Sequence, residues 1–89
     1  MSGVSEFFRS VNDRTRRVEG TAVRVSEIVC ECADERCART IRLRFDEYAA
    51  LRADGRQFAL APGHEWPGAE EVIARNLRYV VVRKRAAAA

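Results

Sequence analysis

Three cysteines and one histidine are the residues of this chain whose types and spacing could do chemistry. Cys30, Cys32 and Cys37 are all of its cysteines and lie within eight residues, and His64 is its one histidine. Three thiolates and an imidazole complete a tetrahedral set for Zn²⁺, an ion that favours sulfur and nitrogen ligands. The sequence therefore predicts one structural zinc ion per chain, held by these four residues.

Two alternatives to this zinc site stay open at the level of the sequence. If His64 is not the fourth ligand, the substitutes are water or one of three acids, Glu31, Asp34 and Glu65. Three cysteines and a histidine also form the ligand set of small [2Fe–2S] proteins of the CDGSH type, so a redox or sensor protein is the second alternative. In those proteins the histidine closely follows the last cysteine, whereas here 26 residues separate Cys37 from His64. Zinc is therefore favoured over the cluster.

The context of the thiols favours metal ligation over disulfide formation. The N-terminal residues lack a basic leader followed by an apolar run, so the cytoplasm, where thiols stay reduced, is the expected location. Three cysteines cannot all pair within one chain. No apolar stretch approaches the ~20 residues that cross a bilayer, and we expect no membrane association.

An amphipathic helix is expected ahead of the cysteines, with residues 1–17 as an N-terminal segment and Gly20 as the residue that ends the helix. Its apolar residues recur at helical spacing and are Val4, Phe7, Phe8, Val11 and Val18. Phe7 and Phe8 are adjacent, and one narrow stripe does not hide both. They are therefore the predicted contacts for an unidentified protein partner or for a second copy in a homodimer. The alternative is that both pack on the sheet through a wide apolar face.

The segments on either side of the cysteines have the pattern of two strands. β-Branched residues alternate with polar ones over 21–30 and over 40–45, which is typical of half-buried strands. Because these segments bracket the cysteine loop, we expect an antiparallel hairpin with the metal at its tip. Outward-facing Arg24, Arg42 and Arg44 would give it a basic face for single-stranded nucleic acid, a possible but less favoured partner because acids are interleaved.

The rest of the chain completes an α+β fold. The predicted elements are a helix over 47–53, a strand over 57–61, a helix over 69–75 and a strand over 77–83. Pro62 and Gly63 turn the chain and place His64 in a loop. We expect a small antiparallel or mixed sheet of about four strands, with three short helices, stapled by the metal knuckle. Residues 18–85 form this metal-stabilised domain, and 86–89 form a disordered alanine tail.

Composition and motifs point away from an enzyme. The chain has 89 residues, 47% of them hydrophobic and 33% charged, with a net charge of +3, which fits one small globular domain. Catalytic zinc keeps an open coordination position, and four protein ligands would leave none. A nucleophile elbow, a phosphate-binding glycine loop and a second histidine are absent. The expected function is that of a small cytoplasmic zinc-binding domain acting as a protein-interaction or regulatory module.

Four segments of the chain carry a family likeness. They are Val-Cys-Glu-Cys-Ala-Asp-Glu-Arg-Cys, Phe-Asp-Glu-Tyr-Ala-Ala-Leu-Arg, Phe-Ala-Leu-Ala-Pro-Gly-His-Glu and Arg-Tyr-Val-Val-Val. Their order and spacing resemble a family of small uncharacterised proteins from high-GC Gram-positive bacteria, over roughly residues 28 to 84. The resemblance implies that the three cysteines and His64 occupy the motif positions of the family. The family carries no assigned function, and the N-terminal helix lies outside the similar region.

Overall fold

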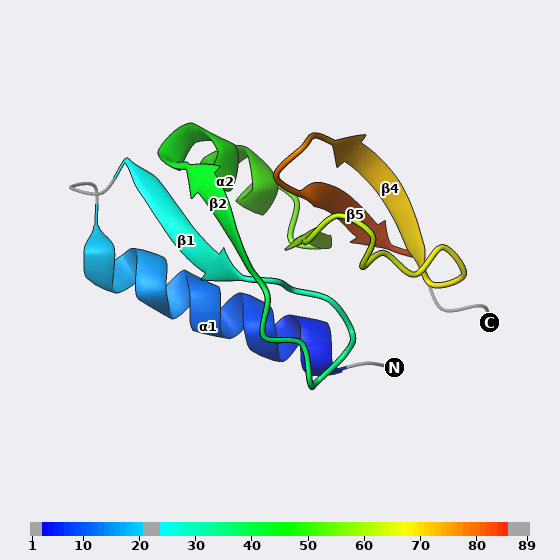
Figure 1. Ribbon diagram of the computed structural model, residues 1–89. Coiled ribbons are helices and arrows are strands. Elements are labelled where there is room, and N and C mark those ends of the chain that lie inside the picture. Colours follow the sequence, from blue (N-terminus) through cyan, green and yellow to red (C-terminus); the bar gives the residue numbers. More distant parts are fainter. Residues whose placement is uncertain (1–2, 21–23, 86–89) are drawn as a thin grey trace.

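The part of the chain that the structure describes has an α+β fold of two helices and two small sheets (Figure 1). A computed structural model describes residues 3–20 and 24–85, to which every structural statement below refers. Along the chain the elements are α1 (Gly3–Glu19), β1 (Val25–Val29), β2 (Thr40–Arg44), α2 (Phe45–Arg52), β3 (Gln57–Leu60), β4 (Glu70–Arg75) and β5 (Val80–Lys84). Within these ranges no helix is long and apolar enough to span a membrane. The alanine tail and residues 21–23 of the first predicted strand lie outside the described residues.

The first sheet is the antiparallel hairpin of β1 and β2, as the alternating pattern predicted. Ile28 lies opposite Ile41 and Ser26 opposite Leu43, and these inward residues are buried. Glu27 and Arg42 are opposite each other on the exposed face. Cys30 extends the pairing, because its N–H donates to the carbonyl oxygen of Arg39 at 2.9 Å. The hairpin therefore presents the cysteine loop at its tip, as expected.

The second sheet has β5 at its centre, with β3 and β4 antiparallel on either side. The run Val80–Val82 is buried, which confirms that this strand is covered on both faces. A β-bulge between Val72 and Ala74 interrupts the pairing of β4 with β5. The prediction of a single sheet of about four strands is thus replaced by two sheets, of two and three strands.

The third predicted helix, over residues 69–75, is wrong. Glu70–Arg75 is strand β4, and its two acids pair with cations on β5 and do not begin a helix. Glu70 accepts a bond from Lys84, and Glu71 lies 3.7 Å from Arg83. A strand is favoured over a helix here because β5 would otherwise have unpaired backbone groups along one edge. Cross-strand ion pairs stabilise the pairing further.

One apolar core lies between the two sheets and under α2. Its members come from every strand except β4, from α2 and from the cysteine loop, and include Ile28, Leu43, Leu51, Phe58, Leu60, Val80, Val82, Cys30 and Cys32. Glu31 joins the two sheets through its backbone, because its N–H donates to the carbonyl oxygen of Ala59 at 2.9 Å. The cysteine loop is consequently part of the core and is docked on β3.

Helix α1 lies along the β1–β2 hairpin (Figure 1), and its inward face is polar. Its buried residues are Ser5, Asn12 and Arg16. Phe7 is 63% exposed, whereas Phe8 is half-buried. The alternative in which both phenylalanines pack on the sheet is therefore wrong for Phe7. α1 runs to Glu19, and Gly20, with a positive φ of 66°, ends it.

Glu47, in the first turn of α2, connects the two sheets through its carboxylate. It accepts hydrogen bonds from the guanidinium of Arg78, between β4 and β5, at 2.6 Å and from the N–H of Arg44 at 2.7 Å. These bonds, that from Arg78 foremost, lower the pKa of Glu47 from 4.5 to about 2. The bond from the N–H of Arg44 also caps the N-terminus of α2. This helix begins at Phe45, two residues before the predicted start.

Glu47→Gln is expected to lower stability near neutral pH by about 1 kcal/mol, because Arg78 loses a charged acceptor. The folded pKa lies below the unfolded one, so this stabilisation is complete above about pH 4.5 and is lost as the pH falls toward 2. Urea denaturation at decreasing pH should show the difference from wild type shrinking below pH 4.5. Glu27→Gln, whose exposed pair with Arg42 spans 3.7 Å, is the control and should change stability by under about 0.5 kcal/mol. A deficit in Glu47→Gln that does not vary with pH would contradict the assignment.

Candidate metal centre

Two loops bring the three cysteines and His64 together. Cys30 and Cys32 follow β1, and the N–H of Cys37 donates to the carbonyl oxygen of Asp34 at 3.0 Å, which turns the chain back. The Asp34 carboxylate holds this turn by accepting the N–H of Arg36 at 2.9 Å. His64 follows β3 in a second turn, where its N–H donates to Ala61.

The turn before His64 depends on two residues with special backbones. Pro62 has a fixed φ, and Gly63 has a φ of 88° that other residues rarely adopt. With the hydrogen bond from His64 to Ala61 at 3.0 Å, this arrangement matches a type II turn. The turn directs the imidazole of His64 back toward the cysteine loop, as the sequence predicted.

The four ligand atoms form a compact set that can hold one metal ion. They all lie within 4.8 Å of one another. Nδ1 of His64 is 3.6 Å from Sγ of Cys30 and 3.5 Å from Sγ of Cys37. Tetrahedral Zn²⁺, with bonds of about 2.3 Å to sulfur and 2.0–2.1 Å to nitrogen, requires sulfur–nitrogen separations of about 3.5 Å. The two sulfur–nitrogen distances to Cys30 and Cys37 therefore fit a tetrahedral ion bound through Nδ1.

Burial controls the protonation of the two inner thiols. It raises the pKa of Cys30 to about 12, against the opposing effect of the backbone N–H groups of Ala61 and Cys32. Burial also raises the pKa of the Cys32 thiol. The N–H of Ala61 donates to Sγ of Cys30 at 3.1 Å, a contact that stabilises a thiolate. A cation is thus needed for these buried sulfurs to become anionic at neutral pH.

The acids considered as substitutes for His64 are all engaged elsewhere. Glu31 is fully buried and bonded to Arg52, so its carboxylate is not available to the metal site. The Asp34 carboxylate caps its own turn, and Glu65 pairs with Arg75 at 2.7 Å. His64 is accordingly the residue that the fold places beside the three cysteines as the candidate fourth ligand.

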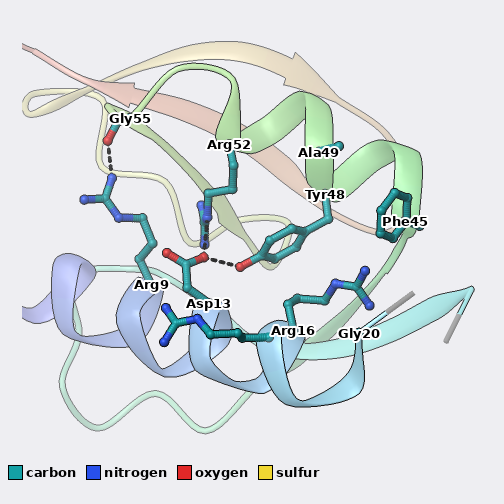
Figure 2. A pocket seen from close by; sticks show the side chains of 10 residues that line it. Arg9, Asp13, Arg16, Gly20, Phe45, Tyr48, Ala49, Arg52 and Gly55 are labelled. Carbon is teal, nitrogen blue, oxygen red and sulfur yellow. Dashed lines mark hydrogen bonds and ion pairs between the residues drawn. The ribbon is translucent and has the colours of Figure 1, made fainter. Parts of the chain in front are cut away.

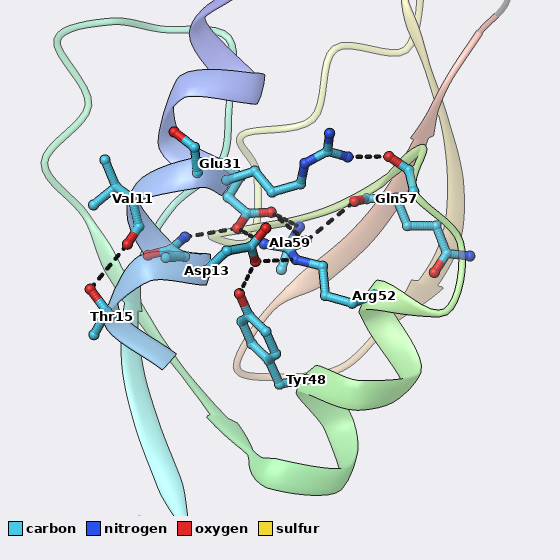
Figure 3. Close-up of polar contacts among 12 residues, drawn as sticks. Val11, Asp13, Thr15, Glu31, Tyr48, Arg52, Gln57 and Ala59 are labelled. Carbon is cyan, nitrogen blue, oxygen red and sulfur yellow. Dashed lines mark hydrogen bonds and ion pairs between the residues drawn. The ribbon is translucent and has the colours of Figure 1, made fainter. Parts of the chain in front are cut away.

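Glu31 is the centre of a buried polar network (Figure 3). Its carboxylate accepts bonds from the guanidinium of Arg52, from the side-chain amide of Asn12 at 2.8 Å and from the N–H of Ala59 at 3.1 Å. Asn12 also exchanges two hydrogen bonds with the backbone of Val29, at 2.8 and 2.9 Å. Glu31, between the first two cysteines, therefore connects the cysteine loop to both helices and to β3.

Sequence reasoning missed this network, although a signal for it was present. Ser5, Asn12 and Arg16 share one face of α1 with Arg9, at helical spacing. A polar face so regular is a candidate for burial against other polar groups, just as an apolar stripe is for burial in a core. The apolar stripe of α1 predicts the opposite orientation, because hydrophobic burial is the usual reason for helix docking.

A cavity of about 660 Å³ between α1 and α2 is lined by several arginines, of which Arg52 and Arg16 have partners (Figure 2). Arg52 donates to Asp13 at 2.7 Å, and the hydroxyl of Tyr48 donates to the same carboxylate. Arg16 donates to Ser26 at 2.9 Å, and its guanidinium lies 4.9 Å from the ring centroid of Phe45. These contacts attach α1 to α2, and the pKa of Asp13 is lowered, since its bonds to Tyr48 and Arg52 outweigh partial burial.

Trp66 lines a second cavity, of about 370 Å³, which also borders Cys32 and His64. The indole is 61% exposed. It therefore stands beside the candidate metal centre as an accessible side chain.

The arginines proposed for nucleic acid do not form one free basic face. Arg42 and Arg44 are exposed on the same side of β2, but they pair with Glu27 at 3.7 Å and with Asp46 at 3.1 Å. Arg24 precedes β1 and lies two residues before the buried Ser26. Strand alternation therefore does not place Arg24 on the face that carries Arg42 and Arg44. Glu27 of β1 and Asp46 of α2 thus neutralise much of the charge that phosphate binding would require.

The function of this site has to be argued from its geometry. Four candidate ligand atoms from two loops lie close enough together to surround one ion. A network of buried polar groups holds the cysteine loop, which supplies three of these atoms. The chain was compared with protein-family models, with curated proteins and with solved structures, and none of these comparisons found a match.

Proposed function

We propose that the protein is a small zinc-binding domain in which one Zn²⁺ per chain, held by Cys30, Cys32, Cys37 and His64, stabilises the fold. The observation that supports this most directly is the convergence of four sulfur and nitrogen atoms within 4.8 Å. Three thiolates and an imidazole are the ligands that zinc prefers. Four protein ligands leave no open position for a substrate, so the ion is structural and the domain is not an enzyme.

A single ion suits this site better than a [2Fe–2S] cluster. Such a cluster separates its ligands into two pairs by the width of the two-iron core, whereas His64 is within 3.6 Å of the sulfurs of both Cys30 and Cys37. The compactness of the set therefore favours zinc.

The role of the folded domain is that of a protein-interaction or regulatory module in the cytoplasm. Exposed apolar side chains on α1, among them Phe7 and Val18, support an interaction role. The ion-paired arginines of the hairpin speak against nucleic acid as the partner.

The reduced protein should bind zinc at one equivalent, with an affinity that falls as the pH is lowered. The thiols must lose their protons on binding, and burial raises the pKa values of Cys30 and Cys32. Competition titration with a chromophoric chelator at several pH values measures both quantities. His64→Ala should weaken binding at least tenfold, and Glu65→Gln, the matched neighbour, should bind as wild type does. Purified protein that carries iron with visible charge-transfer absorption, or no equivalent of metal, would overturn the proposal.

A further inference from the structure

Helix α1 has an apolar stripe on the side opposite the sheet. Phe7, Val11 and Val18 are 63%, 37% and 83% exposed. At 100° per residue these three positions lie within about 40° of one another. The buried residues Asn12 and Arg16 lie roughly opposite. The stripe is thus directed away from the domain to which α1 is attached.

The two ends of the stripe differ in shape. At the N-terminal end, a cavity of about 360 Å³ is lined by Gly3, Val4, Phe7 and Phe8, with Glu35 of the cysteine loop at its edge. At the other end Val18 projects into solvent. A two-fold axis that crosses α1 at right angles near Val11 would relate two copies of the chain. The hollow of each copy would then face the projecting side chain of the other. Val18 of the partner subunit then lies level with Val4 and enters the hollow, and the same contact occurs at the other end.

Glu6 and Arg17 lie on one flank of α1, about 100–120° around the helix from Val18, and suit an antiparallel pair. Glu6 is exposed near the N-terminus of α1, whereas Arg14 and Arg17 are exposed in its second half. Antiparallel pairing brings Glu6 level with Arg17 of the partner subunit and opposes the two helix dipoles. Parallel pairing would instead place each arginine beside its own copy. The charge pattern therefore selects one orientation.

We propose that the protein forms a symmetric dimer in which the α1 helices of two copies pack antiparallel through Phe7, Val11 and Val18. This deepens the interaction role proposed above, naming the partner as a second copy, and does not depend on which metal occupies the site. α1 has 17 residues, so the contact between the two helices is about 25 Å long. A contact limited to one helix per subunit buries a small area for a specific interface. We therefore expect a dimer that dissociates in the micromolar range.

Sedimentation equilibrium of the full-length, metal-loaded protein tests the dimer, from low micromolar to near-millimolar concentration. Val18→Glu should weaken association at least tenfold. Val25→Glu, at a position 49% exposed on β1 and away from the stripe, is the matched control and should associate as wild type does. Metal content and circular dichroism are measured on each sample, so that loss of the zinc site is distinguished from loss of the dimer.

A charge exchange tests the antiparallel orientation. Glu6→Arg and Arg17→Glu should each weaken association several-fold, and the double variant should restore it. The two positions are eleven residues apart on one helix, too far for a contact within the chain. Wild type that is monomeric at every concentration, a dimer insensitive to Val18→Glu, or a double variant no tighter than the single ones would overturn the proposal.

Discussion

Cys37→Ser is expected to abolish stable folding of the domain. Structural zinc contributes on the order of 10 kcal/mol of apparent free energy, as much as the whole stability of a typical small domain. Cys37 lies in the one turn that returns the cysteine loop to the other ligands, and its Sγ is 3.5 Å from Nδ1 of His64. Without this sulfur, three ligands remain and the metal affinity falls steeply.

Thermal denaturation, followed by circular dichroism with zinc present, measures this loss. The variant should show no cooperative transition at the wild-type temperature and should retain less than one equivalent of zinc. Glu35→Gln changes an exposed side chain of the same loop and should melt as wild type does. In excess chelator the wild type and Cys37→Ser should behave alike, because the difference between them is the metal. A variant that melts normally with zinc bound would show that Cys37 is dispensable.

Arg52→Leu is expected to cost about 3–5 kcal/mol, because it leaves the buried carboxylate of Glu31 without its cation. Glu31 is fully buried, and the guanidinium of Arg52 bonds both to it and to Asp13. Burial lowers the pKa of Arg52, but the bonds to Glu31 and Asp13 outweigh it and hold the pKa above the ordinary value. Chemical denaturation of the metal-loaded variant measures the change in unfolding free energy.

Comparison with other variants separates the buried pair from ordinary surface pairs. Glu31→Gln should cost less than Arg52→Leu, because Arg52 keeps its bond of 2.7 Å to Asp13. Arg42→Leu removes an exposed pair, whose side chains are 73% and 59% exposed, and should change stability by less than about 1 kcal/mol. If Arg52→Leu is as stable as wild type, the network does not hold α1 and the cysteine loop in place.

Local patterns were sufficient for the elements that carry the candidate metal ligands. The alternation over 40–45 predicted β2 closely, and the spacing of the cysteines predicted their convergence. Pro62 and Gly63 predicted the turn that places His64. Each of these features depends on neighbouring residues or on a short loop, so the chain encodes it over a few positions.

The strand β4 shows where a local pattern fails. Residues 69–75 follow Pro67 and Gly68 and carry two acids, which together are typical of a helix start. Glu70 and Glu71 instead meet Lys84 and Arg83 on β5. The choice between helix and strand was made by a partner strand that is distant in sequence, because the open edge of β5 requires hydrogen bonds.

The sequence by itself determined the candidate ligand set, the hairpin that presents it and the turn before His64. Only the tertiary structure decided which face of α1 is buried and where Glu31 points. The alternation that turns Cys30 and Cys32 to the same side also turns Glu31 to the other side, but whether that side is solvent depends on the docking of α1. Asn12 and Arg52 meet Glu31 there. The polar face of α1 is buried because it satisfies this carboxylate, and its apolar stripe is consequently left on the surface.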